Sequence, residues 1–149
     1  MNNEVLFSTK SDEWSTPQAL FDKLNDFFHF NLDPCATDEN HKCEKYYTIE
    51  TDGLSQNWEG HVSFVNPPYS QCKEWIKKCS EEGRKPNTAV VCLVPSRTDV
   101  RWFHDYCVNK SSIIFLKGRL KFGDSKNSAP FPSMICIFDN ISVYCHGCG

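Results

Sequence analysis

Residues 62–69 read Val62-Ser63-Phe64-Val65-Asn66-Pro67-Pro68-Tyr69, an apolar run closed by an amide, two prolines and a tyrosine. The run predicts a buried strand, and proline ends it because its ring fixes φ and it has no N–H to donate. Such a strand brings an amide, two rigid carbonyls and an aromatic ring to the rim of a sheet. An ordinary strand followed by a Pro-Pro turn has the same local sequence, so the surroundings must decide between the two.

Helical and strand-like patterns alternate on both sides of this run. Apolar residues at helical spacing predict helices over about 17–28, 70–83 and 99–108. Apolar or alternating runs predict further strands over 30–33, 88–94, 112–116, 118–122 and 133–138. The run over 88–94 is almost wholly apolar, as in a central strand covered on both faces. We therefore expect an α/β fold with a mostly parallel sheet that closes in an antiparallel C-terminal hairpin.

The composition is that of one globular domain. The chain has 149 residues, of which 40% are hydrophobic and 23% charged, so it can bury a core and does not resemble a disordered chain. No apolar stretch approaches the roughly 20 residues of a membrane span, and the N-terminus lacks the pattern of a signal peptide. We expect a single minimal domain over residues 1–149, with its core at about 12–139, no membrane partner and a cytoplasmic location.

Nine cysteines, an odd number, are scattered along the chain, several of them in apolar runs. This usage fits reduced thiols in a cytosol. The tail Cys145-His146-Gly147-Cys148 has the spacing of metal ligands, but a structural zinc site needs four ligands and the chain has no second pair of this spacing. We therefore expect free thiols and no metal.

Charge is unevenly distributed. The formal net charge is −3, which argues against a protein that coats nucleic acid through bulk charge. Residues 97–126 contain seven basic and three acidic side chains, so this third is at +4 and the remainder at −7. The sequence is compatible with a basic face on an acidic body and equally with a mixed, solvated surface.

The end of the 62–69 run suits recognition of a planar amine. The amide oxygen of Asn66 and the carbonyl of Pro67 can accept both hydrogens of an exocyclic NH2, while Tyr69 stacks on the ring that carries it. The nitrogen lone pair then turns out of the ring plane. The amine becomes a nucleophile without a general base.

Polar or turn-forming residues also follow the neighbouring predicted strands. In open α/β sheets, ligands bind beyond the carboxyl ends of the strands, so these segments should meet in one cleft. Taken singly, each has a local explanation as a strand-end cap, a turn or a strand terminator, and only together do they favour a site. The segments are Asp33-Pro34-Cys35-Ala36, Asp52-Gly53-Leu54, Asn66 to Tyr69 and Pro95-Ser96-Arg97.

Over about residues 12–139 the chain resembles the phage-type DNA N6-adenine methyltransferases. The resemblance rests on several motifs that occur in order. They are Asp12-Glu13-Trp14-Ser15-Thr16-Pro17, Leu32-Asp33-Pro34-Cys35-Ala36, Asp52-Gly53-Leu54 followed by Trp58 and Gly60, Asn66-Pro67-Pro68-Tyr69-Ser70, Arg97-Thr98-Asp99 with Trp102-Phe103-His104, and Gly118-Arg119-Leu120-Lys121-Phe122.

The resemblance implies a compact class I, Rossmann-like methyltransferase fold that uses S-adenosylmethionine. It implies transfer of the methyl group to N6 of adenine in DNA by in-line displacement, with the target base flipped out or single-stranded. It also implies a link to phage and to restriction-modification, and the host cytoplasm as location if the gene is carried by a phage. From the length of the chain we expect no separate target-recognition domain. Self-association into a homo-oligomer is left open.

The resemblance assigns roles to residues by motif. Asn66, Pro67, Pro68 and Tyr69 would hold the target base and form the catalytic set. Thr16 and Pro17 would lie near the methionine end of the cofactor, Asp33, Pro34 and Ala36 around it, and Asp52 and Leu54 near its adenine. Arg97, Arg119 and Lys121 are the expected DNA contacts. For the cofactor ribose, Glu50 is the candidate acidic residue.

Other functions use the same features. Cytosine N4, an RNA base or a protein glutamine amide could each be the amine acceptor, and an inactive DNA-binding module could keep the fold. A dinucleotide-binding oxidoreductase is disfavoured because no GxGxxG follows the first strand. The loop after that strand, Cys35-Ala36-Thr37-Asp38, contains no glycine at all, a feature that the family it resembles shares.

Overall fold

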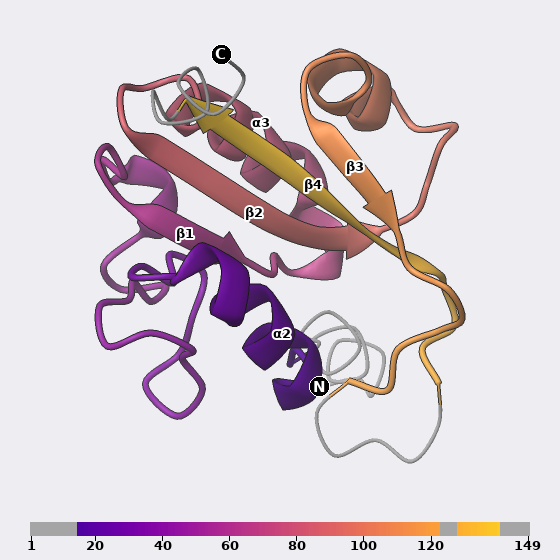
Figure 1. The fold of residues 1–149 in the computed structure, drawn as a ribbon, viewed down its shortest axis with the longest axis horizontal. Helices are drawn as coiled ribbons and strands as arrows, with labels where there is room; N and C mark the ends of the chain where they lie inside the picture. Colours follow the sequence, from indigo (N-terminus) through magenta and orange to yellow (C-terminus); the bar gives the residue numbers. More distant parts are fainter. Residues whose placement is uncertain (1–14, 123–127, 141–149) are drawn as a thin grey trace, which may run out of the picture.

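The strand β2 (Thr88–Pro95) lies at the centre of a four-stranded sheet in the computed structural model, which describes residues 15–122 and 128–140. The strand order is β1 (Val62–Val65), β2, β4 (Ser133–Asn140) and β3 (Ser112–Phe115), as Figure 1 shows. β1 runs parallel to β2, whereas β4 runs antiparallel to both β2 and β3. The protein is therefore a mixed α/β structure.

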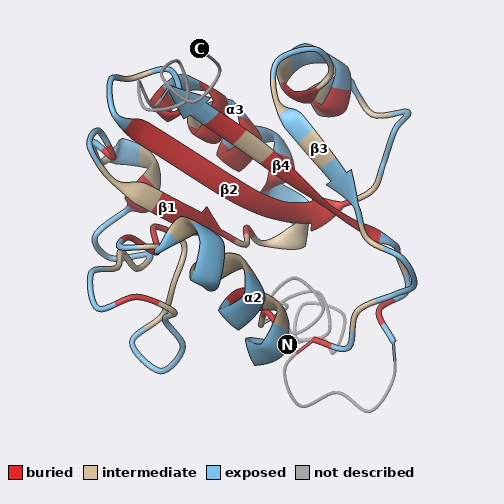
Figure 2. Ribbon diagram, viewed as in Figure 1, coloured by how far each residue is buried: buried red, intermediate tan, exposed pale blue. Residues whose placement is uncertain are grey.

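The predicted mostly parallel sheet is not confirmed. Of the three pairings between named strands, one is parallel and two are antiparallel, and β4 is inserted between β2 and β3 instead of lying at the edge. Burial explains the order, because β4 is buried along most of its length and needs neighbours on both sides, while β3 is largely exposed and suits an edge (Figure 2). Two isolated parallel bridges, Leu32 to Ser63 and Asp33 to Tyr46, continue the sheet beyond β1.

β2 has an apolar contact on each face, as its sequence predicted. Val90, Cys92 and Val94 belong to one hydrophobic cluster with the helix α3 (Cys72–Glu82). Val91 and Leu93 belong to a second cluster with Phe21 of the helix α2 (Gln18–Phe28). Because alternate residues of a strand point to opposite faces, α2 and α3 cover opposite sides of the sheet (Figure 1).

Two of the three predicted helices are confirmed. α2 begins at Gln18 with Pro17 before it, and α3 begins after the short helical turn η2 (Tyr69–Gln71) and buries the predicted Cys72, Trp75, Ile76 and Cys79. The third prediction, 99–108, is wrong in extent: regular structure is confined to Arg101, Trp102 and the π-helical segment η3 (Phe103–Cys107). Two buried side chains, Phe103 and Cys107, hold this short segment to the core without a longer helix.

The predicted strand over 118–122 is absent from the structure, in which β4 pairs with β3.

Within the described residues no helix is long and apolar enough to cross a membrane. The single domain without a separate target-recognition domain stays a prediction.

Candidate functional site

Three hollows are each lined by one or more of the residues that follow β1, Asn66, Pro67 and Pro68. The polar hollow, about 210 Å³, is lined by Thr16, Asp33, Asn40 and Asn66 among others. The outer hollow, about 310 Å³, is lined by Pro34, Asp52, Gly53 and Leu54 among others. These two share Cys35, Ala36, Ile49 and Pro68 in their linings, so they are neighbours, and we call the pair the groove.

The third hollow, the aromatic hollow, lies on the other side of Asn66 and Pro67. It is lined by Asn66, Pro67, Tyr69, Phe122, Phe131 and Ser133, together with the end of β2. Its volume is only about 10 Å³, the size of about one water molecule. Asn66 and Pro67 therefore lie between a roomy polar hollow and a narrow aromatic one.

Asp33 is a buried carboxylate in the wall of the polar hollow. Its side chain oxygen Oδ2 accepts the backbone N–H of Lys42 at 2.8 Å, and the residue is 5% exposed. Burial raises the pKa of this carboxyl, although backbone N–H groups of Lys42 and Cys35 oppose the shift. Burial, with Asp33 nearby, also raises the pKa of the Cys43 thiol to about 12, so that thiol is not ionised at neutral pH.

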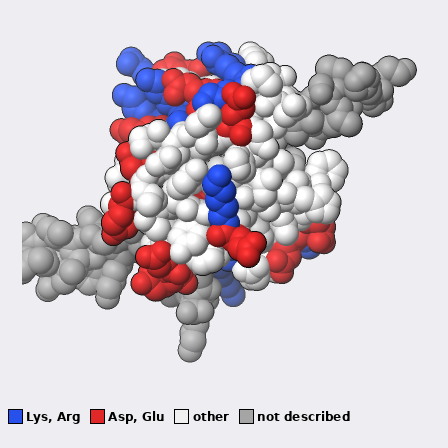
Figure 3. All heavy atoms as spheres, turned by 90° about the vertical axis from the view of Figure 1, so that its left-hand side faces the viewer, with Lys and Arg blue, Asp and Glu red and all other residues white. Residues whose placement is uncertain are grey.

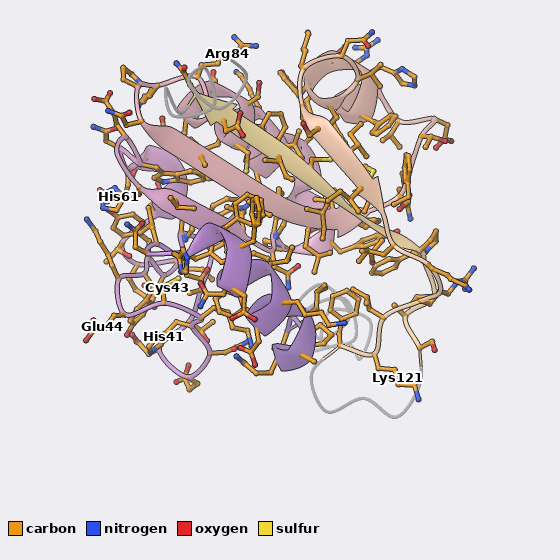
Figure 4. All side chains as sticks on the ribbon, viewed as in Figure 1. His41, Cys43, Glu44, His61, Arg84 and Lys121 are labelled. Carbon is orange, nitrogen blue, oxygen red and sulfur yellow. The ribbon has the colours of Figure 1, made fainter. Side chains whose placement is uncertain are left out.

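Main-chain hydrogen bonds fix the loop that carries Asp33. The N–H of Asp33 donates a hydrogen bond to the carbonyl of Lys45 at 3.0 Å, and the N–H of Tyr47 donates one to the carbonyl of Asp33 at 3.0 Å. Ala36 donates its N–H to Tyr47 at 2.9 Å. The polar loop between them, which carries His41, Cys43 and Glu44 in Figure 4, is thereby closed onto the strand end.

Side chains of this loop bring the N-terminal segment to the polar hollow. Asn40 Nδ2 donates to Ser15 Oγ at 2.6 Å, and Lys42 Nζ donates to Gln18 Oε1 at 2.7 Å. Thr16, between these two anchors, is 5% exposed and lines the hollow. Pro17 lies at the start of α2 and not in the lining.

The outer hollow depends on close packing between two loops. Gly53, in the short turn η1 (Gly53–Ser55), lies so near Pro34 that a Cβ there would overlap the Pro34 carbonyl oxygen. Trp58, fully buried, donates its Nε1–H to the carbonyl of Gly53 at 2.9 Å. The glycine thus joins the Asp52 loop to the Asp33 loop, and the tryptophan holds it there.

Glu82 at the end of α3 supports Trp58 from behind. Its carboxylate accepts the Trp58 backbone N–H at 2.6 Å and pairs with Lys85 at 2.7 Å and Lys78 at 3.1 Å. Burial would raise the pKa of Glu82, but hydrogen bonds from Lys85, the Trp58 backbone and Lys78 outweigh it, so its pKa is lowered. This buried ionised group is part of the scaffold of the outer hollow.

Aromatic side chains and one arginine surround Tyr69 beside the aromatic hollow. Phe131 lies 5.1 Å from Tyr69 between ring centroids and 6.0 Å from Phe122. The Arg97 guanidinium lies 4.8 Å from the centroid of Tyr69. Tyr69 does not line the polar hollow with Asp33, so Asn66 and Pro67 are the residues of the predicted set that lie on both sides.

The predicted DNA contacts are all at the surface. Arg97, Arg119 and Lys121 are exposed, and the segment with Arg119 and Lys121 leads directly into Phe122 of the aromatic hollow. Figure 4 shows Lys121 on the far side of α2 from His41. The face in Figure 3 carries its Lys and Arg mainly at the top of the view and Asp and Glu around the rim, so this side is mixed in charge.

The model of the DNA N-6-adenine-methyltransferase (Dam) family matches residues 4–142. The chain belongs to this family. A DNA N-6-adenine-methyltransferase of Haemophilus phage HP1 is 30% identical over 146 residues, covering 91% of this chain and 84% of the relative. Another, of Escherichia phage T1, is 34% identical over 112 residues, covering 73% of this chain and 46% of the relative, so the chain spans less than half of that protein.

Two further comparisons cover a smaller part of this chain. A protein of Escherichia coli described as a putative methyltransferase is 37% identical over 65 residues, or 39% of this chain and 71% of the relative. Among solved structures, a putative RNA methyltransferase from Pyrococcus horikoshii aligns with a TM-score of 0.42 at 14% identity, covering 66% of this chain and 52% of that one. The family match and the phage relatives confirm the predicted family and activity, methylation of adenine N6 in DNA.

Sequence reasoning missed several residues that surround the site of this DNA N-6-adenine-methyltransferase. Asn40 and Ile49 line the groove, and Phe131 and Ser133 line the aromatic hollow. Phe131 could have been noticed, since it stands between two prolines near a motif. Glu50, the candidate for the cofactor ribose, accepts a hydrogen bond from Thr48 Oγ1 at 2.8 Å and lines none of the three hollows. Asp52, in contrast, lines the outer hollow.

The seven described cysteines carry free thiols, and the described residues contain no group of three or more His, Cys, Asp or Glu side chains that could hold a metal ion. Cys145 and Cys148 lie outside the described residues, as does the Asp12-Glu13-Trp14 part of the first motif.

Proposed function

We propose that this family member transfers a methyl group from S-adenosylmethionine to adenine N6 in DNA, with the methyl donor in the polar and outer hollows and the target base in the aromatic hollow. The observation that carries the proposal is the position of Asn66 and Pro67, which line both the polar and the aromatic hollow. An amine held by these two residues would stand between the two binding places. The fold is proposed to be of class I, with the site beyond the ends of the parallel strand segments at Asp33 and β1.

The groove suits the methyl donor that the family implies. The two hollows, about 210 and 310 Å³ with a shared wall, together lie within the usual range of ligand pockets, about 300–1,000 Å³. Asp33 offers a buried carboxylate acceptor and Thr16 a hydroxyl at one end, and Asp52 and Leu54 offer a carboxylate and an apolar contact at the other. The absence of a side chain at Gly53 keeps these loops together around the groove. Bound there, S-adenosylmethionine supplies a methyl group on a positively charged sulfur.

The residues after β1 then prepare the amine. The side chain oxygen of Asn66 and the carbonyl of Pro67 accept the two N6 hydrogens, which leaves the nitrogen lone pair free to attack. The same two oxygens stabilise the positive charge that grows on the nitrogen, and Tyr69 stacks on the base. Positioning is the main source of rate, because holding the nitrogen about 3 to 3.5 Å from the methyl group in line with the leaving sulfur removes most of the entropic barrier. Pro68 lines both hollows of the groove and shapes its shared wall.

Surface cations are proposed to hold the DNA while the base leaves the stack. Arg97 lies over Tyr69, so it would sit beside the phosphates that flank a flipped base. Arg119 and Lys121 precede Phe122 and would bind the backbone on the other side of the aromatic hollow. Such contacts give affinity and register without reading sequence.

Asn66→Ala tests the proposal most directly. We expect loss of measurable methyl transfer from tritiated S-adenosylmethionine to adenine-containing DNA, with donor binding in calorimetry close to that of the wild type, because the groove beyond Asn66 is intact. Asn57→Ala is the matched control, since Asn57 is exposed and lines none of the three hollows. Retained transfer in Asn66→Ala, or equal loss in both variants, contradicts the proposed role.

A further inference from the structure

Three buried hydroxyl oxygens in the described part of the chain have no hydrogen-bond partner: those of Ser63, Ser96 and Ser133. Ser133 is 1% exposed and is the one of the three that lines a hollow. A buried hydroxyl without a partner is costly, because folding strips it of water and gives nothing back. Such a group at a binding site is best explained by a ligand that completes it.

The register of the sheet places Ser133 beside the proposed base site. Ser133 is the first residue of β4 and pairs with Pro95, the last residue of β2. It alternates with Met134, which packs on the α3 side, so its side chain points to the opposite face with Ile135 and Phe122. There it shares the aromatic hollow with Asn66, Pro67 and Tyr69.

The aromatic hollow brings the three polar groups into one lining. Ser133, Asn66 and Pro67 border the same space, which has room for about one water molecule. In the proposed arrangement the side chain oxygen of Asn66 and the carbonyl of Pro67 are occupied by the amine. Tyr69 and Ser133 both line this hollow and both carry an O–H donor. Because the ring of Tyr69 is assigned to the face of the base, Ser133 is the hydroxyl of the described lining that is left for a ring nitrogen at the edge.

We propose that Ser133 Oγ donates a hydrogen bond to a ring nitrogen of the target adenine next to the methylated amine, N1 or N7. This inference rests on the proposed function and assigns a base-reading residue to it. N1 is bonded to the ring carbon that carries N6, and N7 is bonded to the next ring carbon on the other side of the amine, so an acceptor lies on each side of N6. With the amine on Asn66 and Pro67 and a ring nitrogen on Ser133, the base is held at three points of its edge and cannot rotate about the amine.

The base must separate two rings to reach this position. Tyr69 and Phe131 have centroids 5.1 Å apart, whereas a base stacked between them needs two contact distances of about 3.5 Å each. An opening of about 2 Å thus exposes the Ser133 hydroxyl to the base edge. In this structure the two rings are in contact and the Ser133 hydroxyl has no hydrogen-bond partner.

Ser133→Ala tests the inference together with deaza analogues of the target base. The substrate is an oligonucleotide with a single adenine that the wild type methylates, prepared also with 1-deazaadenine and with 7-deazaadenine at that position. We expect Ser133→Ala to lower kcat/KM on adenine about tenfold. The wild type should lose a similar factor on one of the two analogues, and Ser133→Ala should lose nothing further on that analogue. The analogue that shows this pattern identifies which ring nitrogen accepts the hydrogen bond from Ser133.

Ser63→Ala is the matched control. Ser63 carries the same buried, unpaired hydroxyl, but it alternates with Phe64 of the α2-side cluster and so points to the α3 side, away from the aromatic hollow. Both variants should keep or raise the thermal midpoint, because each removes an unsatisfied group, while only Ser133→Ala slows methyl transfer.

The outcomes separate the two proposals. Wild-type protein that methylates no DNA adenine overturns the proposed function. If the wild type is active, two results overturn the role of Ser133 alone. One is a normal rate of methyl transfer in Ser133→Ala, and the other is a further loss of equal size in Ser133→Ala on both analogues. The second result is the one expected if the hydroxyl only binds a buried water.

Discussion

The groove and the aromatic hollow differ in how they are built. Main-chain hydrogen bonds and close loop contacts form the groove: Asp33 is clamped to residues 45–47, and Gly53 lies against Pro34. Side chain rings form the aromatic hollow and largely fill it, with Tyr69 on Phe131. The proposed donor side is therefore preformed, whereas the proposed base side must open. Preforming one partner's site lowers the cost of binding it, and a narrow second site leaves room for only about one water molecule before a base enters.

The largest effect is expected at the contact that holds the groove together. In Gly53→Ala the new methyl group overlaps the Pro34 carbonyl, which is backbone and cannot turn aside, so we expect a loss of about 3 kcal/mol in the free energy of unfolding. Donor binding should fall with it, since the two loops must separate. Urea denaturation and calorimetry measure these two quantities.

Gly118→Ala is the control for this substitution. Gly118 has a φ of 74° but nothing within 4 Å of an added Cβ, so only backbone strain of about 1–2 kcal/mol is expected and donor binding should be unchanged. Wild-type donor affinity in Gly53→Ala would show that the groove does not depend on this packing.

Asp33→Asn, in the wall of the polar hollow, should change donor binding and stability in opposite directions. Loss of a charged acceptor is expected to weaken donor binding about 10- to 100-fold. Burial raises the pKa of Asp33, so the ionised form is disfavoured in the folded state. The contribution of the carboxyl to stability is full below its unfolded pKa, 3.8, and is lost as pH rises through the raised folded pKa.

Asp33→Asn should therefore raise the thermal midpoint at pH 7, and this gain should vanish below about pH 3.8. Calorimetric titration with donor and thermal scans at both pH values test the two parts. A variant that binds donor as well as the wild type at pH 7 contradicts the proposed contact, whatever its midpoint.

The aromatic hollow should respond to the size of the ring at position 69 and not to its polarity. Tyr69→Ala is expected to lower kcat/KM for DNA about tenfold through lost stacking, whereas Tyr69→Phe keeps the ring and should retain most of the activity. Neither should change donor affinity, because Tyr69 does not line the polar or outer hollow. If donor affinity falls in both variants, the two sides are not independent and the comparison between them fails.

Most elements near the site could be predicted because their signals are local. The Asn-Pro-Pro-Tyr end of β1, the amphipathic pattern of α2 and α3, and the wholly apolar β2 each specify their own structure. The family could be predicted because several motifs occur in a fixed order, and the family match confirms it.

What could not be predicted depends on pairing between distant segments. Nothing in residues 133–140 says that this strand is inserted between β2 and β3, because that choice rests on the relative burial of three strands. In the same way the unpaired Ser133 hydroxyl is invisible in the sequence, where serine at the start of a strand is ordinary. The residue roles assigned by motif stay predictions until the variants above are measured.

The smallest effect is expected from titration of Glu82, which supports the preformed side through Trp58. Its pKa is lowered because hydrogen bonds from Lys85, the Trp58 backbone and Lys78 outweigh burial. Its contribution to stability is therefore present above its unfolded pKa, about 4.5, and is lost as pH falls through the lowered folded pKa. The free energy of unfolding, from urea denaturation, should decline more below about pH 4.5 in the wild type than in Glu82→Gln. Glu81→Gln, an exposed neighbour, should follow the wild type, and parallel pH curves for all three proteins would show that Glu82 does not hold the Trp58 loop through its charge.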